Sequence, residues 1–296
     1  MNSKLSRRDF LAMSGVGGLV LASGLPGCAS MAGGSNFSFV QITDMHWGYA
    51  NPKVNPEARI TLPRAIAAVN AMEHKPDFVV FTGDLTQTTD DPKVRRQRLH
   101  EVKDMIAGIR GTQVRTFAGE HDASLDRGAA YLEVFGGQLN YTFDHKGVHF
   151  IVLDNCSDPA PILGAKQIEW LKADLARQRQ DQPIVVLTHR PLFAMYPQWD
   201  WDTRDGQQAI DALMPFKNVT VFYGHVHHEH HFRTGHIEHH AATSTMFPLA
   251  PVGTMPQKTQ LPWTPSQPFK GLGYRSVQAS ASGAAQQPRE IPLVRS

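Results

Sequence analysis

The amino-acid sequence predicts an α/β fold in which helices flank largely parallel or mixed β-sheets. Apolar runs of four to six residues recur along the chain, as expected for buried strands. They cover residues 37–42, 78–82, 114–118, 149–153, 184–188 and 219–223. Segments with apolar residues at helical spacing lie between several of these runs. Alternation of strands and helices is typical of layered α/β domains.

The remaining predicted elements are helices and one hairpin. Helical spacing of apolar residues is found at residues 62–72, 94–109 and 165–180. The last of these segments places Ile168, Leu171 and Leu175 on one face, which would pack against a sheet. A β-hairpin is predicted to turn near Thr234 and Gly235.

Composition suits a globular domain and leaves the function open. The chain has 296 residues, of which 41% are hydrophobic and 19% are charged, as in one domain with or without an export segment. The formal net charge is only +2, so we expect no nucleic acid partner. The 15 histidines are more informative, because eight of them crowd between residues 225 and 240 and imidazole is the commonest metal ligand.

The N-terminus has the features of a twin-arginine signal peptide. Arg7 and Arg8 are followed by Phe10 and Leu11, and then by a short apolar stretch that extends to Leu25. A membrane anchor is the alternative, but the stretch is rich in glycine and falls below the ~20 apolar residues that span a bilayer. We therefore expect export to the periplasm through the twin-arginine export machinery.

Residues 25–28 resemble a lipoprotein cleavage box, in which Cys28 becomes the lipid-bearing first residue of the mature protein. Because Pro26 is uncommon in such a box, both membrane attachment through lipidated Cys28 and a free periplasmic protein stay open. The other cysteine, Cys156, is expected to be a buried or half-buried free thiol. No intramolecular disulfide is predicted if Cys28 is lipidated or removed.

These features give a simple domain organisation. Residues 1–28 form the signal peptide, residues 29–36 a linker, and residues 37–296 the folded domain. Within that domain, residues 279–288 are expected to be flexible.

Five clusters that contain carboxylate or imidazole side chains come directly after predicted strands. They are Asp44-x-His46, Gly83-Asp84, Gly119-Glu120-His121-Asp122, Thr188-His189 and Gly224-His225-Val226-His227. Strands of an α/β sheet direct their carboxyl ends to one crevice, so clusters that are distant in sequence can meet there. Any single histidine is more simply explained as a hydrogen-bonded imidazole. The ordered set of five indicates a metal site.

Spacing within the clusters supports the same interpretation. Asp44 and His46 are two residues apart, as are His225 and His227, so an extended chain would point both members of a pair to one face. A glycine, which allows a sharp turn and a close approach of the backbone, precedes a ligand at positions 83, 119 and 224. Carboxylates and imidazoles without thiolates suit divalent or trivalent ions such as manganese, iron, zinc, cobalt or nickel.

The ordered motifs resemble those of the calcineurin-like metallophosphoesterase family over residues 37–245. This resemblance implies a two-sheet α/β sandwich flanked by helices, with two metal ions. One ion would be held by Asp44, His46, Asp84 and His227. The other would be held by Asp84, Glu120, His189 and His225, so that Asp84 bridges the pair. Residues 76–84 are most similar to the bacterial cyclic-nucleotide phosphodiesterase branch.

The resemblance also implies hydrolysis of a small phosphodiester or phosphomonoester. Two cations about 3.5–4 Å apart can hold a hydroxide and clamp the phosphoryl oxygens for in-line attack. His121 occupies the position of the family's catalytic histidine, which would protonate or stabilise the leaving oxygen, with a purely supporting role as the alternative. Asp122 could orient the His121 ring. Arg190 could bind phosphoryl oxygens through two parallel hydrogen bonds, or form a structural salt bridge.

The sequence departs from the family at Glu120, where the usual motif has asparagine. The added negative charge should tighten the second metal and repel a dianionic monoester more than a singly charged diester. We therefore hypothesise a bias toward diesters. The alternative is that Glu120 swings away and the second metal site is weak.

Two further features stay open at this stage. The irregular stretches 195–206 and 247–268 could form walls or a lid of the site, or be plain surface loops. The other histidines of the hairpin would mostly be solvated or supporting residues, with a third, adventitious metal site as the alternative; they are His228, His230, His231, His236, His239 and His240. A lipid-anchored metal-binding protein without turnover and a pyrophosphohydrolase are the competing functions.

Overall fold

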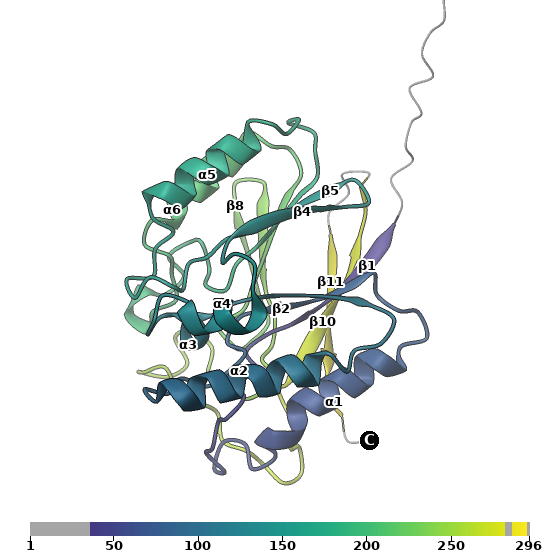
Figure 1. Cartoon of the computed structure of the whole chain (residues 1–296), viewed down its shortest axis with the longest axis vertical. Helices are drawn as coiled ribbons and strands as arrows, with labels where there is room; N and C mark the ends of the chain where they lie inside the picture. Colours follow the sequence, from purple (N-terminus) through teal and green to yellow (C-terminus); the bar gives the residue numbers. More distant parts are fainter. Residues whose placement is uncertain (1–35, 282–285, 295–296) are drawn as a thin grey trace, which may run out of the picture. The chain divides into compact units, whose positions relative to one another are not determined.

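The computed structural model describes residues 36–281 and 286–294, which form two mixed β-sheets with helices on their outer faces (Figure 1). The predicted signal peptide, Cys28 and nearly all of the predicted linker lie outside the described residues. None of the helices in the described part of the chain has the length and apolar character needed to cross a bilayer.

The first sheet contains β1 (Phe37–Ile42), β2 (Phe78–Thr82), β3 (Gln113–Phe117), β10 (Gly273–Ala279) and β11 (Gln287–Pro292). Its strand order is β11-β10-β1-β2-β3. The three N-terminal strands are parallel, and Phe39 of β1 lies opposite Phe78 of β2. The strands β10 and β11 extend the sheet in antiparallel fashion beyond β1.

The second sheet contains β4 (Tyr141–His145), β5 (Val148–Val152), β6 (Ile184–Leu187), β7 (Val219–Tyr223), β8 (His230–Thr234) and β9 (Ile237–Ala241). Its strand order is β4-β5-β6-β7-β9-β8. The four central strands are parallel, whereas β4 and β8 pair antiparallel to β5 and β9 at the two edges.

Aromatic side chains fill the space between the two sheets. Alternate residues of the central strands point inward, and they include Phe37, Phe39, Phe78, Val80, Phe117, Phe150, Val185, Leu187 and Phe222. The rings of Phe39 and Phe78 stack at 5.0 Å, and Phe222 of the other sheet meets Phe39 edge-on at 5.6 Å. Burial of each such side chain contributes about 1.5–3 kcal/mol to stability. This interior holds the two sheets in a fixed relation.

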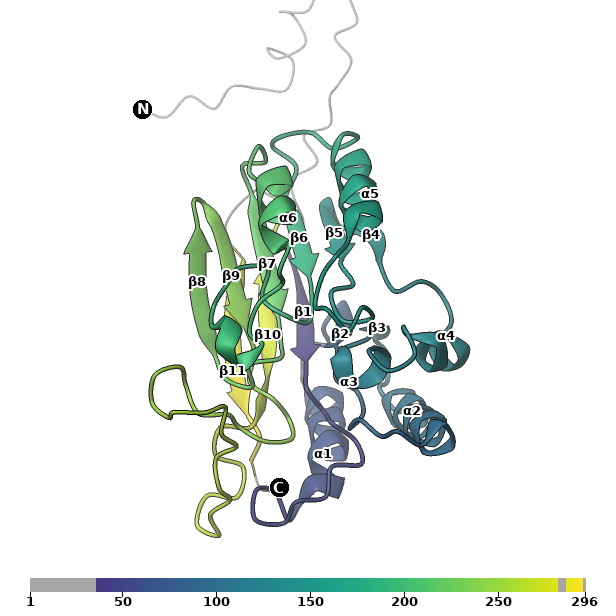
Figure 2. The ribbon, with the colours of Figure 1, turned by 90° about the vertical axis from the view of Figure 1, so that its left-hand side faces the viewer.

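The intervening residues of the same strands face the helices. α1 (Ala58–Ala71) and α2 (Pro92–Ile106) cover the outer face of the first sheet, and α5 (Ala165–Leu175) and α6 (Gly206–Leu213) cover the second (Figure 2). Two short helices, α3 (Glu120–Ala123) and α4 (Ala129–Phe135), follow β3, and a 3-10 turn, η2 (Pro197–Trp199), follows β6. The structure thus confirms the predicted α/β sandwich flanked by helices.

The six predicted strands, the three predicted helices and the hairpin are all confirmed, with shifted ends. For example, α2 begins at Pro92 because the Asp91 carboxylate accepts hydrogen bonds from the Lys93 and Val94 backbone N–H groups. The antiparallel strands β4, β10 and β11 and the helix α6 were not predicted. The segment expected to be flexible, 279–288, overlaps β10 and β11 at its two ends; β11 tolerates two prolines because it is an edge strand.

Candidate metal centre

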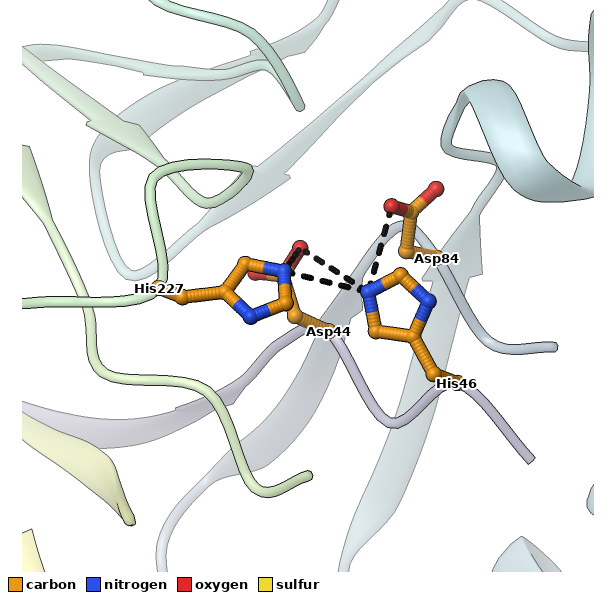
Figure 3. Close-up of side chains that lie close together, drawn as sticks. All are labelled: Asp44, His46, Asp84 and His227. Carbon is orange, nitrogen blue, oxygen red and sulfur yellow. Dashed lines mark hydrogen bonds and ion pairs between the residues drawn. The ribbon is translucent and has the colours of Figure 1, made fainter. Parts of the chain in front are cut away.

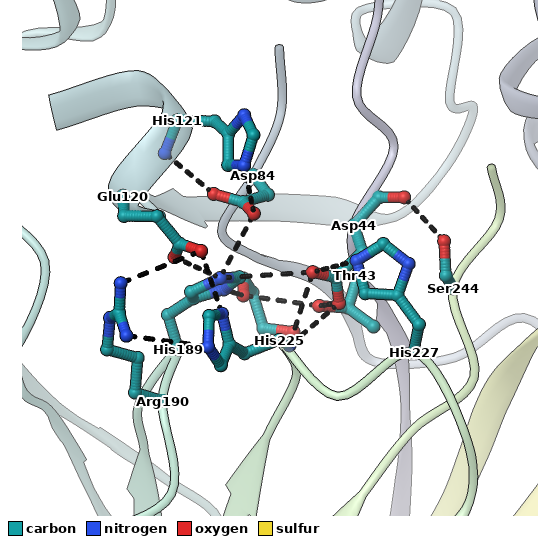
Figure 4. Close-up of polar contacts among 12 residues, drawn as sticks. Thr43, Asp44, Asp84, Glu120, His121, His189, Arg190, His225, His227 and Ser244 are labelled. Atoms are coloured by element: carbon teal, nitrogen blue, oxygen red, sulfur yellow. Dashed lines mark hydrogen bonds and ion pairs between the residues drawn. The ribbon is translucent and has the colours of Figure 1, made fainter. Parts of the chain in front are cut away.

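The seven side chains predicted to be metal ligands meet where strands of both sheets end (Figures 3 and 4). Asp44 and Asp84 lie two residues beyond β1 and β2, and His189 and His225 lie two residues beyond β6 and β7. Glu120 begins α3, shortly after β3. Because β1, β2 and β3 belong to one sheet and β6 and β7 to the other, the site joins the two sheets.

The first group of donors consists of Asp44, His46, Asp84 and His227, whose ligand atoms all lie within 4.8 Å of one another (Figure 3). His46 Nε2 is 3.5 Å from an Asp84 carboxylate oxygen, and His227 Nε2 is 3.2 Å from an Asp44 oxygen. The Nε2 atoms of His46 and His227 are 3.1 Å apart. All four residues are buried.

The second group consists of Asp84, Glu120, His189 and His225, again with all ligand atoms within 4.8 Å. His189 Nε2 is 2.8 Å from Glu120 Oε2 and 3.3 Å from Asp84 Oδ2. His225 Nδ1 is 2.8 Å from the other Glu120 oxygen. Glu120 therefore points into the site and does not swing away. Asp84 belongs to both groups, as the sequence predicted for the bridging ligand.

Backbone carbonyls orient three of the four imidazoles. Each of these rings donates one N–H to a carbonyl: His189 Nδ1 to Thr82 at 2.8 Å, His225 Nε2 to Asp200 at 2.8 Å, and His227 Nδ1 to Phe247 at 2.7 Å. The other ring nitrogen faces the carboxylates, and in the neutral imidazole it carries the lone pair that binds a metal. The carboxylates raise the pKa of His189 well above its usual range, so a metal ion at Nε2 would take the place of a proton.

Five of the ligand residues have left-handed backbone conformations, with φ of 53° at Asp44, 40° at His46, 49° at Asp84, 66° at His225 and 59° at His227. Such conformations cost about 1–3 kcal/mol per non-glycine residue and cluster at functional sites. The expectation of an extended chain at the paired ligands was therefore wrong. The side chains converge because the backbone coils sharply after each strand.

Two glycines make room for the ligands. A Cβ atom on Gly119 would lie 2.2 Å from Asp84 Oδ1, and one on Gly83, where φ is 90°, would lie 2.3 Å from His189 Nδ1. Any side chain at these positions would displace a ligand. The sequence predicted that the backbone at these glycines comes close to another group, and that group is a ligand side chain in both cases.

Charge and burial at the site fit a pair of cations. Burial disfavours ionisation of Asp84 and Glu120, but His189 and other nearby positive groups hold the pKa of both carboxyls below its usual range. Burial lowers the pKa of His46 to about 3, so this ring is neutral. His189 Nε2 is buried and faces oxygens of Asp84 and Glu120. Lone pairs and anionic oxygens that converge in this way match the nitrogen and oxygen donor set of manganese, iron or zinc.

His121 lies at the rim of the site. Its Nε2 is 3.9 Å from Asp84 Oδ2, and its side chain is 27% exposed. Its Nδ1 is held by Thr88, whose backbone N–H donates at 3.2 Å and whose hydroxyl lies at 2.6 Å. Because an N–H can only donate, Nδ1 is the acceptor and the neutral ring carries its proton on Nε2. Thr88 was not predicted to have this role, because a lone threonine in a loop gives no sequence signal of it.

Asp122 does not orient the His121 ring, contrary to expectation. Its carboxylate accepts hydrogen bonds of 2.8–3.0 Å from the backbone N–H groups of Leu85, Thr86 and Gly119. Burial and a neighbouring carboxylate raise the pKa of Asp122 to about 6. Asp122 thus ties the loop after β2 to the loop after β3, which places it in a structural role.

Arg190 forms a structural salt bridge, which is the second of the two roles considered for it. Its Nη1 donates to the Asp200 carboxylate at 2.7 Å and to the Asp200 carbonyl at 2.8 Å, and its Nη2 lies 3.7 Å from Glu120 Oε1. The side chain is buried. Arg190 is therefore engaged by protein carboxylates, and its guanidinium partly offsets the charge of Glu120.

A cavity of about 550 Å³ opens onto the centre. Five of the ligand candidates and His121 line it. The rest of the lining comes mainly from Val54 and from the segment 247–268, through Phe247, Leu249, Lys258, Thr259 and Gln260. This segment is therefore a wall of the site. The segment 195–206 does not line the cavity and instead supports a ligand. Trp199 and Trp201 are buried, and the Asp200 carbonyl accepts a hydrogen bond from His225.

Two expectations about other residues are settled by the structure. Cys156 is a buried free thiol, as predicted, with its sulfur 3.9 Å from Glu120 Oε2. In the hairpin, His239 and His240 are buried, whereas His231 is exposed and shares a 2.7 Å contact with His240. Across the described residues, three or more donors gather in the two groups above, and the hairpin adds no third group.

Comparison with known proteins is consistent with this geometry. The model of the family described as calcineurin-like phosphoesterase matches residues 37–229. The chain is 31% identical over 189 residues to the serine/threonine-protein phosphatase CPPED1 of Homo sapiens, covering 58% of this chain and 59% of that protein. It is 26% identical over 181 residues to a probable cyclic nucleotide phosphodiesterase of Rhodococcus erythropolis, covering 58% of each. The chain thus spans less than two thirds of either relative.

Solved structures share the fold. A dimetal phosphatase from Danio rerio superposes with a TM-score of 0.57 and 14% identity, over 87% of this chain and 99% of that one. A purple acid phosphatase from yellow lupin superposes with a TM-score of 0.61 and 16% identity, over 88% of this chain and 52% of that one. At these identities the likeness concerns the fold alone.

The shared position of Asp84 predicts an asymmetry in metal binding. Asp84→Asn should lower the metal affinity of both sites by more than about 10-fold. His46→Ala should lower the affinity of one site and leave that of the other near its original value. Equilibrium dialysis against Mn²⁺ with metal analysis measures both affinities, and Asp104→Asn on the exposed face of α2 serves as the control. Loss of a single ion in Asp84→Asn would contradict the shared position.

Proposed function

Because the chain belongs to the calcineurin-like phosphoesterase family, we propose that it hydrolyses a small phosphodiester or phosphomonoester at a centre of two metal ions. The observation that supports this most directly is that two groups of four donors share Asp84. Metal ions held by a common carboxylate are close enough to act on one phosphoryl group.

The metal ligands and the loops that carry them would have separate roles in the reaction. Bound metal ions would supply an activated water and polarise the phosphoryl group. Asp44, Asp84 and Glu120 provide the negative charge that retains the ions, and the oriented imidazoles complete the two donor sets. Asp122 holds the loops that carry Asp84 and Glu120 at their observed separation.

His121 is the proposed general acid. Thr88 directs the His121 proton to Nε2, the nitrogen that faces Asp84 and the cavity. When the bond between phosphorus and the leaving oxygen breaks, that oxygen would take the Nε2 proton and leave as an alcohol. The partial exposure of the ring allows the leaving group to approach it.

The cavity supports a substrate with an organic group. Its volume of about 550 Å³ is well above the size of a phosphate ion, and Val54, Phe247 and Leu249 give it an apolar side. The amide side chains of Gln87 and Gln260 belong to residues that also line the cavity. We infer an ester that carries an apolar or aromatic group.

The charge of Glu120 supports a preference for diesters. Its carboxylate lines the cavity, where it would repel a dianionic monoester more than a singly charged diester. Arg190, 3.7 Å away, reduces this repulsion without removing it, because Asp200 shares the guanidinium.

Export is a separate proposal, which depends on residues 1–28 of the sequence. We propose that the chain leaves the cytoplasm by the twin-arginine route, either as a periplasmic protein or attached through lipidated Cys28. Replacement of Arg7 and Arg8 by lysine should retain the protein in the cytoplasm, as cell fractionation would show. Unchanged export of this variant would rule the route out. Metabolic labelling with a fatty acid, compared between wild type and Cys28→Ala, decides lipidation.

Metal-dependent turnover tests the main proposal. The manganese- or iron-loaded protein should hydrolyse bis-p-nitrophenyl phosphate, and His121→Ala should lower kcat about 10²–10⁴-fold. Thr88→Val should lower kcat less, with Thr88→Ser close to wild type. No turnover of diester, monoester or pyrophosphate would favour the metal-binding alternative, and turnover of pyrophosphate alone would favour a pyrophosphohydrolase.

Replacement of Glu120 tests the diester preference. Glu120→Asn removes the negative charge, so kcat/KM for p-nitrophenyl phosphate should rise relative to that for the diester. The ratio of the two kcat/KM values is measured at equal metal occupancy. An unchanged ratio would show that Glu120 does not select by substrate charge.

A further inference from the structure

Lys258 is the cation best placed to meet the substrate. Among the described residues that line the cavity at the metal centre, it is the only lysine or arginine. It comes from the segment 247–268, which lines the same cavity as the metal-ligand candidates His46, Asp84 and Glu120. The same cavity is lined by Asp84 and Glu120, so an approaching anion meets two carboxylates there.

Arg190 cannot take this role in the observed geometry. Its guanidinium is buried and is engaged by Asp200 and Glu120, and it does not line the cavity. Turning it toward a phosphoryl group would leave the Asp200 carboxylate and the Glu120 charge without their partner. Leaving a buried guanidinium without its carboxylate partners is costly.

The backbone that follows Lys258 is anchored. Thr259 accepts a hydrogen bond through its carbonyl from the Ala250 N–H at 2.9 Å, and Gln260 pairs with Leu249 in an antiparallel bridge. The Gln260 side chain accepts a 2.7 Å hydrogen bond from the Tyr49 hydroxyl. The lysine therefore extends from a fixed strip of chain at the cavity wall.

The ammonium group itself has donors to spare. Among the described residues, its one hydrogen bond is to the Trp199 carbonyl at 3.5 Å, which is at the long limit for such a bond. A lysine ammonium has three N–H donors. At least two of them can bind an anion without breaking an existing ion pair.

We propose that Lys258 binds a non-bridging oxygen of the substrate phosphate and thereby sets how much substrate charge the site accepts. This inference rests on the proposed phosphoesterase function. Lys258 counters the carboxylates that line the cavity, so a dianionic monoester gains more from it than a singly charged diester does. Glu120 and Lys258 act in opposite directions on the same selection.

Lys258→Gln tests the proposal, with Lys270→Gln, an exposed lysine two residues beyond the segment 247–268, as the matched control. Isothermal titration of inorganic phosphate into the metal-loaded proteins should show an affinity about 5–20-fold lower for Lys258→Gln and unchanged for Lys270→Gln. In hydrolysis, KM for p-nitrophenyl phosphate should rise more than KM for the diester. Equal melting temperatures would verify that both variants fold.

The two measurements separate this inference from the proposed function. If the wild-type protein hydrolyses no phosphoester, the proposed function fails. The phosphate titration would still test whether Lys258 binds phosphate. Equal phosphate affinity in wild type and Lys258→Gln, or no phosphate binding by either, overturns the role of Lys258. Equal rises in KM for both esters overturn its role in charge selection.

Discussion

The structure depends on the burial of three carboxylates against four imidazoles at the junction of the two sheets. Such a cluster is unfavourable by itself, because buried charges lose their hydration and the ring lone pairs face anionic oxygens. Left-handed backbone at five of the ligand residues adds to this cost. The aromatic interior between the sheets supplies the opposing stability, and bound cations would supply the rest.

Loops far from one another in sequence determine the chemistry of the ligands. The carbonyls of Thr82, Asp200 and Phe247 select the tautomers of three imidazoles, and two of those carbonyls come from the irregular stretches of the chain. The same stretches contribute Asp200 to the Arg190 pair and Lys258 to the cavity. Substrate selection and metal binding are therefore coupled through shared loops, which explains why similar ligand motifs can serve different substrates.

Much of the fold and all seven ligand candidates could be predicted from the sequence, because buried strands and the motifs after them are local patterns. The strands β10 and β11 could not, since these mixed polar segments form strands only by pairing with β1 and with each other. The partners of Asp122, Arg190 and His121 could not either. Each of these depends on which neighbouring loop offers a donor or acceptor, and that is decided by packing of segments distant in sequence.

The most direct test is electron paramagnetic resonance of the protein loaded with two Mn²⁺ ions per chain. If Asp84 bridges the ions, their spins must couple, and the spectrum should show the broad multiline signal of an exchange-coupled pair. In Asp84→Asn that signal should be lost. A spectrum of two isolated Mn²⁺ ions in the wild-type protein would contradict a shared centre.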